Sequence, residues 1–246
     1  MIRRSLTMIV TVFAVVLASL LVVVPAQAEE AARPAQVYII HGIPGRDLGL
    51  KRNRLPVDIA VNDVCTLTNF KFRQVVGPVE LPEGTYNIKI SLANKKHPCS
   101  NAPVIEADVP FAAGESATVI AHLSEAGAPT ASKFVNDLTP AASAENGVVV
   151  ARHTAAVPTV DLLVSLEGSD EVLATIAGVS NGAQARAELP VYTKFSVGFA
   201  PAGTTTVVAS ATIEACEDEI AIYHAVGSLT NKTFTIIPLY IPIPQH

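Results

Sequence analysis

Short runs in which apolar and polar residues alternate recur along the chain after residue 28. In the run 57–62, Val57 and Ile59 share one face, while Asp58 lies on the other. The runs 86–91 and 160–164 repeat this arrangement. A period of two residues is typical of β-strands with one buried face.

Turn-forming residues separate these runs, as at 82–84, 112–115 and 201–203. No window of helical length after residue 28 keeps a period of 3.6 residues. Several short strands with turns at regular spacing predict an all-β fold of antiparallel β-sandwiches.

The pattern of the first half returns in the second half. The first strand and its successor, 37–41 and 56–61, are echoed by 148–153 and 159–164. Residues 81–86 are echoed by 189–192, and 117–122 by 219–224, with His122 aligned on His224. The offset of about 100 to 112 residues is the size of a domain rather than of a solenoid repeat. We therefore expect two tandem domains.

The first 28 residues have the features of a secretion signal. Arg3 and Arg4 precede an apolar run from Leu6 to Val24, and Ala26-Gln27-Ala28 fits the small-residue cleavage pattern. Cleavage between Ala28 and Glu29 is the preferred interpretation. An uncleaved membrane anchor is the alternative, because the run approaches the ~20 residues that span a bilayer. The predicted organisation is a signal at 1–28, a first domain at 29–142 and a second at 147–246, and the predicted location is secreted or in the cell envelope.

Charge adds one local feature. Without Arg3 and Arg4 the chain keeps 15 of its 17 basic residues against 22 acidic ones, a net charge of −7. An acidic exported chain is a poor candidate for nucleic-acid binding. The favoured interpretation of the one basic loop is a solvated insertion. Its four cations are Arg46, Lys51, Arg52 and Arg54.

Three cysteines follow the predicted signal. Cys65 and Cys99 both lie near strand ends beside turn residues, and export places them where a disulfide persists. We predict that they pair. Cys216 is left over in an acidic turn, and its neighbours should raise the pKa of its thiol. No Cys or His spacing is typical of a structural zinc site.

Several motifs together resemble a known family. The first strand ends in His41 and is followed by Pro-Val-Asp-Ile-Ala-Val-Asn (56–62), Leu-Pro-Glu-Gly-Thr-Tyr (81–86) and Ala-Val-Gly-Ser-Leu (225–229). The mature chain resembles two tandem copies of the bacterial Domain of Unknown Function 4397. The resemblance implies immunoglobulin-like β-sandwiches on an exported protein, and no functional residues.

Four histidines occur at repeated positions: His41, His122, His153 and His224. In each half one ends the first strand and the other lies on a late strand. We hypothesise that His41 approaches His122 and that His153 approaches His224. Partly buried imidazoles that hydrogen-bond loop carbonyls are the favoured interpretation. A transition-metal or proton-sensing pair is the alternative, so no metal site is predicted beyond these four.

Gly178 to Gly182 matches the G-x-S-x-G nucleophile elbow, with His153 and Asp161 as possible triad partners of Ser180. That motif acts between a buried strand and a helix, and no such helix is predicted here. A glycine-rich loop is therefore the preferred interpretation, and a serine hydrolase using Ser180 is the alternative.

The remaining acidic residues favour structural roles. Asp58 and Asp161 occupy equivalent strands, and each carboxylate is expected to accept hydrogen bonds from a neighbouring turn. The clusters 167–171 and 217–219 are solvated turns with weak calcium binding as the alternative. Asn231-Lys232-Thr233 fits a glycosylation sequon.

No catalytic constellation outweighs its structural explanation. The preferred function is a non-enzymatic, exported module for cell-surface or extracellular binding or adhesion, with no cofactor and no nucleic-acid partner. A protein or an envelope polysaccharide is the expected partner, with the protein favoured because the chain has no Trp, 5 Tyr and 8 Phe. A purely structural envelope component is the third possibility. Contact with a membrane is expected only through an uncleaved signal segment.

Overall fold

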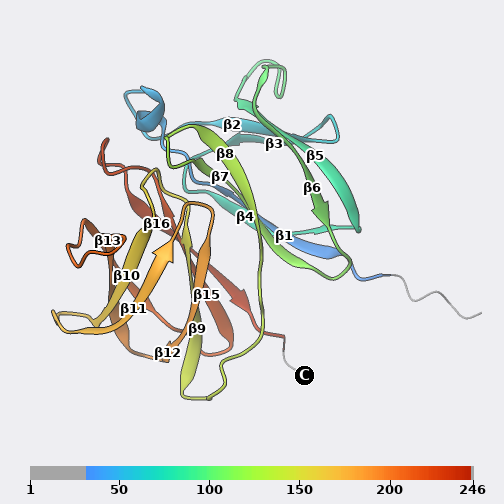
Figure 1. Cartoon of the computed structure of the whole chain (residues 1–246). Coiled ribbons are helices and arrows are strands. Elements are labelled where there is room, and N and C mark those ends of the chain that lie inside the picture. Colours follow the sequence, from blue (N-terminus) through green and yellow to red (C-terminus); the bar gives the residue numbers. More distant parts are fainter. Residues whose placement is uncertain (1–31, 245–246) are drawn as a thin grey trace, which may run out of the picture. The chain divides into compact units, whose positions relative to one another are not determined.

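The structure is a computed structural model that describes residues 32–244 (Figure 1). The predicted signal and its cleavage point, Ala28 and Glu29, lie outside the described residues. The described part is all β apart from one short 3-10 helix, η1 (Gly45–Leu48), which confirms the predicted fold class. The strands of the first half are β1 (Ala35–His41), β2 (Val57–Val61), β3 (Val64–Phe70), β4 (Val75–Leu81), β5 (Gly84–Leu92), β6 (Pro103–Phe111), β7 (Ser116–Leu123) and β8 (Pro129–Val135).

Eight further strands follow in the second half. They are β9 (Asn146–His153), β10 (Val160–Leu166), β11 (Val172–Val179), β12 (Gln184–Pro190), β13 (Lys194–Pro201), β14 (Ala209–Glu214), β15 (Glu219–Val226) and β16 (Thr235–Pro242). Residues 136–145 connect β8 to β9 without a strand. This connection holds most of the predicted boundary at 142–147, which stays a prediction.

The two halves have the same topology. The first half forms sheets in the order β4-β1-β7-β8 and β3-β2-β5-β6, and the second forms β12-β9-β15-β16 and β11-β10-β13-β14. Replacing each strand of the first half by the strand eight later gives the second half. The first strand pairs in parallel with the seventh in both halves, and the other pairings are antiparallel. The sequence echoes therefore reflect equivalent strands.

Each half is a sandwich because the inner faces of its two sheets carry apolar residues at alternate positions. Ile59 and Ile90 from one sheet of the first half pack with Ala121 from the other. Leu162 and Phe199 pack with Val149 in the second half. These cores account for the period of two residues in the sequence.

A further apolar cluster joins the two sandwiches. Tyr38 and Ile120, on the outer face of β4-β1-β7-β8, share one buried cluster with Val150, Ile222 and Ile237 of β12-β9-β15-β16. Strands β1, β7, β9 and β15 are thus apolar on both faces, which is why nearly all of their residues are buried. We call this contact between the two sheets the seam.

Within residues 32–244, no helix has the length and apolar character needed to cross a membrane.

Candidate functional site

Three loops gather at one end of the first sandwich. Val57, the first residue of β2, lies opposite Phe70 on one side and Leu92 on the other. The loop before β2 (42–56), the loop after β3 (71–74) and the loop after β5 (93–102) therefore leave the sheet at the same end. A backbone hydrogen bond from Ala93 N to Pro56 O at 3.0 Å joins two of these loops, and Arg73 N in the loop 71–74 donates at 2.8 Å to O of His41, the residue directly before the loop 42–56.

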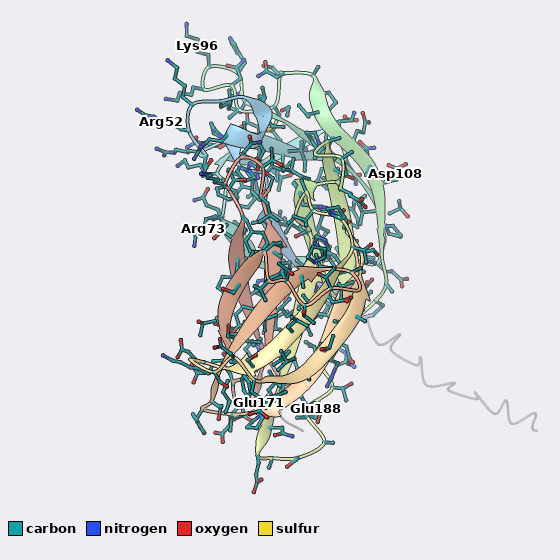
Figure 2. All side chains as sticks on the ribbon, turned by 60° about the vertical axis from the view of Figure 1, so that its left-hand side comes forward. Arg52, Arg73, Lys96, Asp108, Glu171 and Glu188 are labelled. Atoms are coloured by element: carbon teal, nitrogen blue, oxygen red, sulfur yellow. A yellow bond between two sulfur atoms is a disulfide. The ribbon has the colours of Figure 1, made fainter. Side chains whose placement is uncertain are left out.

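Eight cations lie on these three loops, and we call them together the basic loop end. They are more than half of the 15 basic residues that follow the predicted signal. All are exposed except Lys71, which is half-buried. Figure 2 shows Arg52, Arg73 and Lys96 on the same side, away from Glu171 and Glu188. The eight are Arg46, Lys51, Arg52, Arg54, Lys71, Arg73, Lys95 and Lys96.

A buried carboxylate in β2 anchors the loop 93–102 and the end of β3. Asp58 is 2 % exposed, and its Oδ1 accepts a hydrogen bond from Asn69 N at 2.9 Å. Its Oδ2 accepts from Asn94 N at 2.9 Å and from Cys99 N at 3.1 Å. Burial raises the pKa of this carboxyl, but the three backbone donors outweigh it and the pKa is lowered. The expectation that Asp58 accepts hydrogen bonds from neighbouring turns is confirmed.

The predicted disulfide reinforces this anchor. Cys65 in β3 is bonded to Cys99 in the loop 93–102, with Cα atoms 5.7 Å apart. Cys99 is also one of the three donors to Asp58, so the loop that carries Lys95 and Lys96 is tied to the sheet twice.

The loop 42–56 is fixed by two other contacts. His41 Nε2 donates to Leu55 O at 2.8 Å, and His41 Nδ1 accepts from Ile43 N at 3.3 Å. Asp47 in η1 reaches the loop between β15 and β16, where its carboxylate accepts from Ser228 Oγ at 2.6 Å and Thr233 Oγ1 at 2.6 Å. The second sandwich thereby holds the basic loop of the first.

The nearby acidic groups are too few to neutralise the eight cations of the basic loop end. The carboxylates of Asp47 and Asp58 are occupied by hydroxyl and backbone donors. Glu125 is exposed on the adjacent loop between β7 and β8. Within residues 32–244, none of the eight cations forms an ion pair. Unpaired Lys and Arg heads on one surface attract anions and bind phosphate or carboxylate groups.

The second sandwich provides an internal comparison, because its equivalent loops are built on the same anchors. Asp161, 7 % exposed, accepts from Gly178 N and Gly203 N at 2.8 Å each. His153 Nε2 lies 3.1 Å from the carbonyl oxygens of Val157 and Pro158. Yet the loops 154–159, 180–183 and 202–208 contain no charged residue. The fold therefore requires the anchors but does not require the cations.

The paired-histidine hypothesis is wrong. In the parallel pairing of β1 with β7, His41 lies opposite Ala121, so His122 points to the other face of the sheet. In β9 and β15, His153 lies opposite Ala225, and His224 again points to the other face. His41 and His153 face the sandwich interiors, whereas His122 and His224 face the seam. The registers of the two parallel pairings make His224 the equivalent of Ile120. The sequence-based alignment of His122 with His224 is therefore wrong by two residues.

All four imidazoles are buried and bonded to carbonyls; His41 and His153 contact loop carbonyls as expected, whereas His122 and His224 contact carbonyls of strands. His122 Nδ1 lies 2.9 Å from Leu123 O, and His224 Nδ1 lies 3.2 Å from Ile237 O. Burial lowers the pKa of His41 to about 4 and, with the adjacent Arg152 charge, that of His224 to about 3. Within residues 32–244, no group of three or more His, Cys, Asp or Glu side chains is placed to hold a metal ion.

A buried guanidinium crosses the seam, and no pattern in the sequence predicted it. Arg152, 1 % exposed, donates from Nη2 to Asn136 Oδ1 at 2.8 Å and from Nε to Gln184 Oε1 at 3.0 Å. Its Nη1 lies 3.2 Å from His224 Nε2, and its charge stands 4.6 Å above the ring of Phe134. Burial lowers the pKa of Arg152, but a guanidinium keeps its proton in proteins. Neutral amide and imidazole acceptors thus hold this cation between the two sandwiches.

The residues of the possible nucleophile elbow lie in a loop. Gly178, the penultimate residue of β11, has a φ of +73°, and Ser180 is exposed directly after the strand. No helix follows, which agrees with a glycine-rich loop. The carboxylate of Asp161 and Nε2 of His153 are bonded to backbone groups, as described above. No assembled catalytic triad therefore supports the serine-hydrolase alternative that uses Ser180.

The remaining predicted positions have ordinary surroundings. Glu167 Oε1 accepts from Thr212 at 3.2 Å, and Glu217 Oε2 accepts from Tyr192 at 2.6 Å. Asn231 of the sequon donates to Asp47 at 2.8 Å. Burial, followed by Glu219 and Glu214, raises the pKa of the free Cys216 thiol, which is the predicted direction.

Comparison with known proteins places the chain in a family. A family model described as a domain of unknown function, DUF4397, matches residues 35–163. The chain belongs to the DUF4397 family. The match runs from β1 into β10 and contains every residue of the basic loop end. A search of curated proteins found no match.

Two solved structures have distant similarity to this DUF4397 protein. One is titled the Bacillus anthracis TIE protein, with 14% identity and a TM-score of 0.25 over 80% of this chain and 33% of that chain. The other is titled the Streptococcal ancillary pilin, with 11% identity and a TM-score of 0.22 over 79% of this chain and 60% of that chain. The present chain thus spans about a third of the first protein and three fifths of the second.

Proposed function

We propose that this DUF4397 protein is an exported, non-enzymatic module that binds a partner at the cell surface or in the extracellular space through its basic loop end. The observation that carries the proposal is the convergence on three anchored loops of eight cations that form no ion pair among the described residues. Loops held by a rigid sandwich are a common place for binding residues. The partner is a protein or an envelope polysaccharide with a negatively charged surface.

The anchors support a binding role because they reduce the entropy lost on binding. Asp58 and the Cys65–Cys99 bond hold the loop 93–102, and Asp47 and His41 hold the loop 42–56. Side chains on loops that are already ordered bind at a smaller cost than those on disordered loops. The second sandwich, whose uncharged loops are held by the equivalent Asp161 and His153 without a disulfide, argues against folding as the reason for the cations.

Export is supported by two independent features. The first 28 residues fit a secretion signal. The Cys65–Cys99 disulfide is of a kind that persists in oxidising compartments outside the cytosol. The proposed location is therefore secreted or in the cell envelope.

Co-sedimentation tests the proposal. The protein from Glu29 onward is mixed with envelope fractions of the producing cell at low and at high salt, with and without a chelator. We expect pelleting that weakens with salt, because exposed charges are screened, and that is unaffected by the chelator. A protein that stays in the supernatant under every condition contradicts the surface-binding role. Pelleting that is lost only with the chelator contradicts the assignment to the basic loop end.

A further inference from the structure

We infer that the ligand of the basic loop end is a linear anionic polymer, bearing phosphate or carboxylate groups along its chain, that contacts all three loops at once. This inference rests on the proposed function and adds the chemical class of the partner. It starts from the distribution of the cations, which are divided among the loops 42–56, 71–74 and 93–102 rather than concentrated around one point. The backbone bonds between these loops make them one continuous surface.

The chemistry of the surface favours a polymer over a folded protein. Stable protein interfaces centre on buried aromatic and apolar side chains. Within the described residues of these three loops, Leu50 is the only exposed large apolar side chain, and there is no Tyr or Trp. The partner is therefore recognised mainly by charge.

The type of cation fits phosphate and carboxylate groups. Four of the eight residues are arginines, Arg46, Arg52, Arg54 and Arg73. The planar guanidinium forms two parallel hydrogen bonds with either group, whereas a lysine acts as a point charge. The surface also lacks the aromatic platforms on which neutral sugars stack. These features predict little affinity for an uncharged glycan.

Binding through several loops has two measurable consequences. A small anion contacts only one or two cations, so affinity should rise steeply with polymer length. Each cation that neutralises a polymer charge also releases a counterion, and for a single-stranded polymer this contributes about −0.7 to the slope of log K against log salt. If five cations are engaged, raising salt from about 50 to about 200 mM lowers the affinity roughly 100-fold.

The experiment measures binding of the protein from Glu29 onward to long-chain inorganic polyphosphate, polygalacturonate, tripolyphosphate and neutral dextran across a salt series. The test variant, which we call the four-fold variant, carries four substitutions at exposed positions on two loops: Lys51→Gln, Arg52→Gln, Lys95→Gln and Lys96→Gln. The control combines Arg33→Gln and Lys194→Gln, which are exposed and outside the basic loop end. Thermal unfolding of each variant checks that it is folded.

We expect the wild type and the control to bind at least one long polymer with the same salt slope, and to bind tripolyphosphate and dextran at least 100-fold more weakly. The four-fold variant should bind at least tenfold more weakly, with a slope reduced by up to about 3. Equal binding by the folded four-fold variant, or no binding of either long polymer by the wild type, overturns the inference.

Parallel co-sedimentation separates this inference from the proposed function. Envelope pelleting without binding to either long polymer leaves the surface-binding role standing and refutes the polymer class, with an acidic protein then to be identified as the partner. Polymer binding without envelope pelleting supports the polymer class and refutes the surface-binding role.

Discussion

Replacement of Asp58 by alanine should destabilise the first sandwich strongly. The change removes one carboxylate that accepts three backbone hydrogen bonds, from Asn69, Asn94 and Cys99, at 2.9 to 3.1 Å. A hydrogen bond to a charged group contributes about 1.5–3 kcal/mol, and a buried donor left without an acceptor costs about 1–3 kcal/mol. Because water reaches part of the loops once the carboxylate is gone, we expect a loss of about 3–5 kcal/mol in the free energy of unfolding.

Urea unfolding of the protein from Glu29 onward, followed by circular dichroism, measures this loss. Asp161→Ala is the comparison, since its carboxylate accepts two backbone bonds instead of three, and its cost should be smaller, about 2–4 kcal/mol. Asp63→Asn is the control, because that side chain is 79% exposed in its ion pair with Lys89 and asparagine also tolerates the left-handed backbone of this turn. Its cost should be about 0–1 kcal/mol. A folded Asp58→Ala protein within about 1 kcal/mol of wild type would refute the anchoring argument.

Three further predictions concern the disulfide, the buried histidines and the seam. Replacing Cys65 and Cys99 by serine should cost about 3–4 kcal/mol in unfolding free energy, from the chain entropy of a closed loop of this length, measured by urea unfolding. His41 and His224 have a pKa lowered in the folded state to about 4 and about 3, so their contribution is complete above the unfolded pKa near 6.5 and is lost as pH falls towards those values. Each pH unit in that window should cost about 1.4 kcal/mol per histidine, and thermal melts from pH 7 to 4.5 that show no decline contradict this. Arg152→Ala should lose about 3–5 kcal/mol in urea unfolding, because it leaves a cavity in the seam and removes a charged donor from two buried acceptors, Asn136 Oδ1 and His224 Nε2, and a loss below about 1 kcal/mol contradicts the role of that cation in the seam.

The strands and anchors were accessible from the sequence because they depend on local patterns. A two-residue period marks β2, β5 and β10, and Asp58 interrupts the apolar pattern of a strand next to turns. Export and the positions of Cys65 and Cys99 near turns were enough to predict their pairing. Each of these inferences uses chemistry within a few residues.

The inferences that failed or were missing depend on contacts between distant segments. The alternation of side chains assigns His41 and His122 each to one face of its own strand. Whether these two faces lie on the same side of the sheet depends on the register of β1 against β7. The four cations of the loop 42–56 were visible because they are close in sequence. Their grouping with Arg73 and Lys96 follows only from the pairing of β2 with β3 and β5.

The contact between the two sandwiches, the seam, could not be predicted from the sequence either. Strands β9 and β15 read as ordinary sandwich strands, and nothing in their pattern indicates which outer face is covered by another sheet. Arg152 occupies the place that Ile40 has in the first half, and only its contact with Asn136 and His224 explains a buried cation there.

The most direct test of the account is envelope co-sedimentation of the four-fold variant of Lys51, Arg52, Lys95 and Lys96 beside the wild type and the control changed at Arg33 and Lys194. At low salt we predict that the wild type and the control pellet with the envelope and that the folded four-fold variant remains in the supernatant. Pelleting of the four-fold variant to the same extent as the wild type would contradict the claim that the basic loop end is the binding surface.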